Sequence, residues 1–70
     1  MKFSHEKVTS AVNARAKKLK LTTAAEVAEA MKIAVPTYRR TVRYQETPAI
    51  STLCHICVFT GKKPNYFFVD

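Results

Sequence analysis

The sequence predicts an all-α fold of five short helices, and three observations favour that class. Apolar residues recur at helical spacing through most of the chain, and helix-capping residues stand between the recurring stretches. The 70 residues include one Gly and three Pro, too few turn residues for an all-β sandwich or barrel. The apolar fraction of 47% is enough for a hydrophobic core, so we expect residues 1–70 to form a single domain.

The first predicted helix begins after Ser4, a residue type that caps helix N-termini. Phe3 and Val8 have the spacing of a hydrophobic staple around that cap. One face is apolar, whereas the opposite side is basic toward the C-terminal end, where cations suit the helix dipole. The expected inner face consists of Val8, Ala11, Val12, Ala16 and Leu19.

A capping box opens the second predicted helix. Thr23 is the cap, and Glu26 lies three positions later, where its side chain can reach back. The helix is expected to end near Met31-Lys32. Its apolar residues at helical spacing are Ala24, Val27, Ala28 and Met31.

The third helix is expected from Pro36 to Arg43, because proline suits the first turn of a helix. Val35 precedes the proline, so its backbone is expected to avoid the helical region. The expected inner face is Tyr38 and Val42, with Thr41 beside them. The side chains of Arg39, Arg40 and Arg43 then point elsewhere.

The fourth predicted helix has Thr47 as its cap and Pro48 as its first residue, and it ends at Gly61. Its apolar residues recur at i, i+3, i+4, i+7 and i+8. This pattern indicates a buried stripe of Ile50, Leu53, Cys54, Cys57 and Val58. For the apolar tail we predict one helical turn from Pro64, with a β-strand over residues 66–69 as the alternative.

The cysteine pair Cys54 and Cys57 is interpreted as two buried free thiols on that stripe. A structural zinc site needs about four ligands. Outside residues 54–57 the chain has no further Cys, and His5 is its one other His. A redox CxxC site would need a βαβ context, which is missing. The sequence also has no nucleophile–base pair, phosphate-binding Gly loop or paired carboxylates. We therefore expect no cofactor, no metal and no enzymatic activity.

The charge balance predicts an anionic partner. Twelve Lys and Arg against five Asp and Glu leave a net charge of +7, which favours nucleic acid first and an anionic membrane second. The basic first helix has a Val and Ala face that suits lipid insertion poorly, so we expect no membrane partner. No apolar run approaches the roughly 20 residues of a membrane span, and no signal peptide is evident. These features predict a reduced, cytoplasmic domain.

The second and third predicted helices are short and joined by a tight turn, with basic residues on the later one. From Thr23 to Phe68 the chain resembles the lambda repressor/Cro-like (XRE-type) helix-turn-helix family. It departs at the turn, where the family usually has Gly and this chain has Lys32, a residue that a positive φ would strain. The matching residues are Glu26-Val27-Ala28, Met31, Ile33, Thr37-Tyr38, Arg40, Pro48, Ile50, Leu53, Gly61 and the run Pro64 to Phe68.

The resemblance implies a compact lambda-repressor-like domain that regulates transcription, similar in its short length to Cro-type phage or prophage repressors. In that family the second helix of the motif enters the major groove of double-stranded DNA. The base-facing positions implied here are Val35, Pro36, Thr37, Arg39 and Arg40. The expected phosphate contacts are Lys17, Lys18, Lys20, Arg43 and the helix start at Thr23.

The remaining apolar residues predict a homodimer, because they exceed what a small domain can bury in one core. A two-fold dimer would place two recognition helices about 34 Å apart on a near-palindromic operator. The alternative is a protein-interaction module of the same fold, such as an antitoxin or anti-regulator, with the tail on a partner protein. We predict no small-molecule ligand. The expected dimer interface consists of Ile56, Phe59, Tyr66, Phe67 and Phe68.

Overall fold

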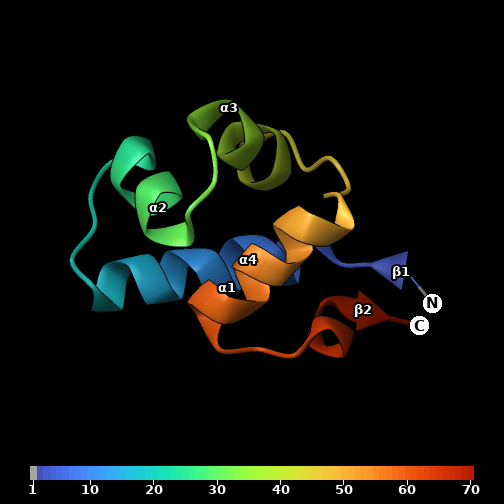
Figure 1. Cartoon of the computed structure of the whole chain (residues 1–70). Helices are drawn as coiled ribbons and strands as arrows, with labels where there is room; N and C mark the ends of the chain where they lie inside the picture. Colours follow the sequence, from blue (N-terminus) through green and yellow to red (C-terminus); the bar gives the residue numbers. More distant parts are fainter. Residues whose placement is uncertain (1) are drawn as a thin grey trace.

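The computed structural model describes residues 2–70, and four α-helices account for most of them (Figure 1). They are α1 (His5–Lys18), α2 (Ala24–Met31), α3 (Val35–Tyr38) and α4 (Ile50–Thr60). A π-helical turn, η1 (Arg39–Arg43), continues α3, and a 3₁₀ turn, η2 (Pro64–Phe67), follows α4. In the view of Figure 1, α2 and α3 stand on one side of α1 and α4, and the two chain ends lie next to each other. The helical class is therefore confirmed.

The tail ends in a strand rather than in a fifth helix. Strand β2 (Phe68–Val69) pairs antiparallel with β1 (Lys2–Phe3), with Phe3 opposite Phe68. The Ser4 N–H also donates to the Phe67 carbonyl oxygen at 2.6 Å. The predicted turn from Pro64 is confirmed, whereas the predicted count of five helices is wrong. The alternative prediction of a strand over residues 66–69 is confirmed for its last two residues, whereas the partner strand at Lys2–Phe3 was not predicted, because the pairing joins opposite ends of the chain.

The predicted helix starts of α1 and α2 are confirmed. The Ser4 hydroxyl accepts a hydrogen bond from the Lys7 N–H at 3.2 Å. The Thr23 hydroxyl accepts from the Glu26 N–H at 3.2 Å, and the Glu26 carboxylate accepts from the Thr23 N–H at 3.1 Å. Both halves of the capping box are therefore present.

Helices α1 and α2 end in the same way, each with a lysine in the left-handed region. Lys20 and Lys32 both have φ of 60°. The next residue closes the helix end in each case, since Leu21 N–H donates to Ala16 O at 2.9 Å and Ile33 N–H donates to Ala28 O at 3.0 Å. This is the Schellman arrangement, in which glycine is the favoured left-handed residue. The positive φ at Lys32 is thus present.

Two predicted helix starts differ from the structure. Helix α3 includes Val35, and its N-cap is Ala34. The first N–H groups of a helix have no intrahelical partner, so Pro36 at the second position removes no hydrogen bond. Helix α4 begins at Ile50 with Ala49 as its N-cap, which makes no side-chain capping bond. The prediction of Thr47 and Pro48 as the cap and first residue is therefore wrong.

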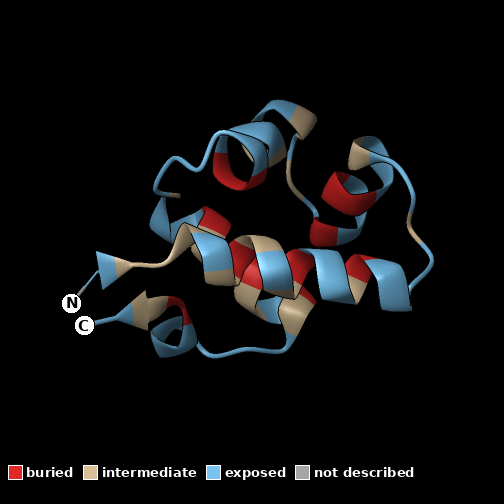
Figure 2. Ribbon diagram, turned by 180° about the vertical axis from the view of Figure 1, so that it is seen from behind, coloured by how far each residue is buried: buried red, intermediate tan, exposed pale blue. Residues whose placement is uncertain are grey.

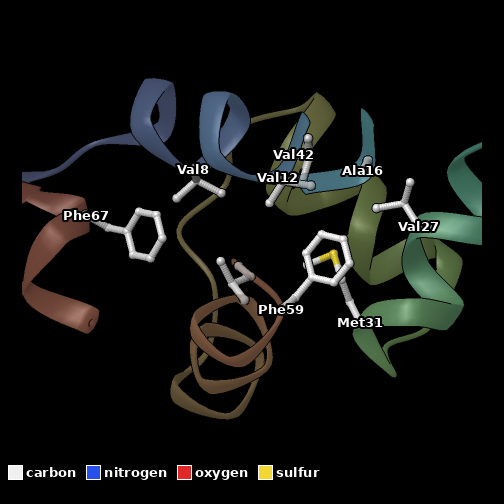
Figure 3. Packing of buried hydrophobic residues seen from close by; sticks show 9 residues of the cluster. Val8, Val12, Ala16, Val27, Met31, Val42, Phe59 and Phe67 are labelled. Atoms are coloured by element: carbon white, nitrogen blue, oxygen red, sulfur yellow. The ribbon is translucent and has the colours of Figure 1, made fainter. Parts of the chain in front are cut away.

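The core joins α1, α2, η1, α4 and the tail (Figures 2 and 3). Figure 3 shows Phe67 at one end of this cluster and Val27 at the other, with Val12 and Val42 facing each other between them. The predicted inner faces of the first three helices are largely confirmed, but Leu19 is 45% exposed because α1 ends before it. The buried cluster consists of Val8, Val12, Ala16, Val27, Met31, Val42, Ile56, Phe59 and Phe67.

Helix α4 buries mainly the face opposite to the predicted stripe, of which only Leu53 and Cys57 pack against the core. Ile50 is 79% exposed and Val58 is 84% exposed, whereas Ile56 and Phe59 are buried. Cys54 is exposed and Cys57 is half-buried, so the prediction of two buried thiols is also wrong. The helix is apolar on both faces, so the packing of α1, α2 and the tail against it, and not its own sequence pattern, decides which face is buried.

Candidate nucleic-acid interface

The π-helical turn η1 carries three arginines, which are Arg39, Arg40 and Arg43. The Tyr44 N–H donates to the Arg39 carbonyl oxygen, five residues back, at 2.9 Å. Thr41 and Val42 are buried, and the Thr9 hydroxyl of α1 donates to the Val42 carbonyl oxygen at 3.4 Å. The turn is therefore held against α1 while its arginines stay in solvent. Single π turns are rare and occur often at functional sites.

A cleft of about 440 Å³ lies between α1, the start of α2 and η1; we call it the basic cleft. Lys17 comes from α1, and Arg39 and Arg43 come from η1, so cations far apart in the sequence face one hollow. No carboxylate is among its lining residues. The other lining residues are Asn13, Ala16, Leu21, Thr22, Thr23, Ala24, Val27, Tyr38 and Val42.

The phenol of Tyr38 adds a neutral donor to the basic cleft. Partial burial raises the pKa of Tyr38 above its usual value of 10.0. Its hydroxyl therefore keeps its proton at neutral pH and can donate a hydrogen bond to an anion. The spacing of Tyr38 to Val42 predicts only an inner-face position and gives no sign of this place in the cleft. Asn13 and Thr22 also line the cleft, and no local pattern pointed to them.

The helix start at Thr23 is already occupied by the chain's own carboxylate. Glu26 Oε1 accepts from the N–H groups of Thr22 and Thr23 and from both hydroxyls, at 2.9–3.3 Å. These hydrogen bonds, with the Thr22 side chain first, lower the pKa of Glu26 from 4.5. The Thr23 N–H is therefore already bound, and a phosphate at this helix start would meet the negative charge of Glu26; the phosphate contact at Thr23 stays a prediction.

Arg40 faces away from the basic cleft. It lines a separate hollow of about 260 Å³ together with Thr37 and Glu46. Thr37 and Arg40, both predicted base contacts, are thus brought together, whereas Arg39 groups with the predicted phosphate contacts Lys17 and Arg43. Of the other predicted base contacts, Pro36 is exposed and Val35 is half-buried.

The remaining predicted phosphate contacts lie at the end of α1. Lys18 is the last residue of α1, and Lys20 follows in the left-handed turn; both are exposed. Neither lines the basic cleft, although Lys17 beside them does. They extend the positive surface around the end of α1 without converging on one point.

The predicted dimer interface does not exist as one surface. Ile56, Phe59 and Phe67 are buried inside the single chain, so a second copy has no access to them. Phe68 is half-buried, and its ring packs edge-on against Phe3 at 5.4 Å between centroids. Tyr66 is 40% exposed and has Lys7 Nζ at 4.9 Å and Lys62 Nζ at 4.8 Å from its ring centroid.

Comparison with known proteins adds no relative. No protein-family model, curated protein or solved structure matches this chain. Within residues 2–70, no helix has the length and apolar character needed to cross a membrane. The same part of the chain contains no group of three or more His, Cys, Asp or Glu that could hold a metal ion.

Proposed function

We propose that this chain is a sequence-specific DNA-binding transcriptional regulator of the Cro-type repressor kind. Helix α2, the turn at Lys32 and the α3–η1 segment would act as a helix-turn-helix, with residues 35–43 in the major groove. The basic cleft carries this proposal, because its lining residues include three cations and no carboxylate. A convergent cationic site on a chain of net charge +7 suits a polyanion.

The two sides of the α3–η1 segment suit two kinds of contact. On one side, Lys17, Arg39 and Arg43 surround a hollow that would accept a backbone phosphate, with the Tyr38 hydroxyl as a further donor. Such contacts set the register of a protein on DNA but do not read sequence. On the other side, Arg40 can present its guanidinium fork to guanine O6 and N7, with Thr37 beside it. Arg39 is therefore reassigned from base reading to phosphate binding.

The proposed mechanism needs no chemistry and no cofactor. A bound protein occupies a promoter and excludes other proteins from it. Two copies on a near-palindromic operator would place their recognition segments about 34 Å apart, which is one turn of DNA. Binding two half-sites together raises the specificity ratio over random DNA, which a single small module cannot supply alone.

The test is selection of bound duplexes from a random pool, followed by affinity measurements against salt. We expect an enriched palindrome, for which Arg40→Ala loses about 1–3 kcal/mol of affinity and relaxes selection at one base pair. Arg43→Ala is the matched control, since it should weaken binding to all sequences similarly and lower the salt slope by about one. Steep salt dependence without any enriched sequence would refute the proposal and favour a protein-interaction module.

A further inference from the structure

Helix α4 has a row of exposed apolar residues that neither the core nor the DNA proposal uses. Ile50, Cys54 and Val58 follow one another at intervals of four residues, and all three are exposed. The half-buried Leu53 and Cys57 flank this row and also pack against the core. We call these five residues the α4 ridge. Single exposed apolar residues are ordinary, but a continuous row along one helix indicates a contact surface.

The charge distribution favours a second copy of this chain as the occupant of the ridge. Ile50–Thr60 contains no Lys, Arg, Asp or Glu, whereas α1 and α2 both carry charged residues. Two copies that each carry +7 repel one another, so they approach most easily through a helix that has no charged side chain of its own, although Lys32 of α2 lies at the hollow beside it. An acidic partner protein would instead gain most from the basic surface around η1 and the end of α1.

A hollow beside the ridge makes the surface self-complementary. It has a volume of about 280 Å³ and lies between the end of α2 and α4, next to Val58. Two-fold dimers use one surface twice, so that surface needs both a protrusion and a recess. The ridge supplies the protrusion, and the hollow supplies the recess. The lining is largely apolar and consists of Ala30, Met31, Lys32, His55, Val58 and Phe59.

We propose that two copies of this chain associate through their α4 ridges, with the two α4 helices antiparallel and the two-fold axis near Cys54. This arrangement places Ile50 of one copy against Val58 and its hollow in the other copy. Cys54 then faces its symmetry mate across the axis. The inference rests on the proposed function, which uses a dimer, and it supplies an interface in place of the core residues Ile56, Phe59 and Phe67.

Sedimentation equilibrium without DNA tests the interface directly. The wild-type chain should show twice its monomer mass of 7.9 kDa. Val58→Lys should weaken self-association at least tenfold, because it sets a charge of equal sign into each half of the contact. Leu19→Lys is the matched control, since it makes the same change at another exposed apolar residue. A monomeric wild type, or equal self-association of the two variants, would overturn the proposal.

Thiol cross-linking tests the position of the axis. In Cys57→Ser, Cys54 is the only thiol, and a short bismaleimide should join two chains in high yield. The double variant Cys57→Ser/Val58→Lys should lose most of that product at the same protein concentration. Equal yields from the two proteins would show random collision rather than a dimer. Thermal melting checks that both variants stay folded, as expected for a residue that is 84% exposed.

Operator binding separates failure of the interface from failure of the proposed function. If both proposals are right, Val58→Lys should bind a single half-site normally and lose at least tenfold in affinity for the palindrome. Undiminished affinity for the palindrome would refute the α4 interface alone. A wild-type dimer that Val58→Lys disrupts, but that selects no operator, would support the interface and refute the regulator.

Discussion

Replacing Lys32 with glycine should stabilise the fold, because Lys32 closes α2 in the left-handed region with φ of 60° and ψ of 40°. An L-residue in that region costs about 1–2 kcal/mol through the clash of its Cβ with the following carbonyl. Glycine avoids the clash but adds flexibility to the unfolded chain, which offsets about 0.4–1 kcal/mol of the gain. The expected net gain is about 0.5–1 kcal/mol. For a domain of this size, that corresponds to a rise in Tm of about 2–8 °C.

Thermal and urea unfolding followed by circular dichroism would measure the effect. Lys32→Gly also removes one positive charge from a chain of net charge +7, and this alone can stabilise it. Lys32→Ala is therefore the control, since it removes the same charge but keeps a Cβ at the left-handed position. Lys32→Gly should melt above both the wild type and Lys32→Ala. A Tm at or below that of Lys32→Ala would refute the argument from backbone strain.

Two further predictions concern the tail and the capping box. Phe67→Ala removes a fully buried ring that ties the tail to the core, and should cost about 3–5 kcal/mol of the free energy of unfolding; a loss below about 1 kcal/mol by urea titration would show that the tail only covers the core. Glu26 has a pKa lowered from 4.5, so its contribution to stability is complete above pH 4.5 and is lost as the pH falls through the lower value of the folded state. The Tm difference between wild type and Glu26→Gln should therefore be largest above pH 4.5 and shrink in acid, whereas a difference independent of pH would contradict this.

Local interactions made several parts of the fold predictable. The Ser4 cap and the Thr23–Glu26 box join residues three apart, so their partners are visible in a short stretch of sequence. The inner face of α1 was also predictable, because its opposite side is polar and leaves one choice. The resemblance to the helix-turn-helix family marked Lys32 as a turn residue, because the family usually has Gly there. A positive φ was therefore to be expected at this position, and the structure has one.

The buried face of helix α4 could not be predicted from such local patterns. Its two faces are both apolar, so the helical period is satisfied by Ile50 and Val58 as well as by Ile56 and Phe59. Only the positions of α1, α2 and the tail determine which face is covered. The choice changes the interpretation of the chain, because it moves the dimer surface from the buried residues to the exposed ridge.

The helical class, the helix starts at Ser4 and Thr23 and the excess of cations could all be predicted from the amino-acid sequence, since they depend on composition and on residues a few positions apart. Which cations share a cleft depends on the packing of the helices. Lys17 lines the same cleft as Arg39 and Arg43 because α1 packs against the π turn η1, whereas Arg40 of the same turn lines a different hollow. These groupings depend on how separate helices pack, and no short-range pattern in the chain records that packing.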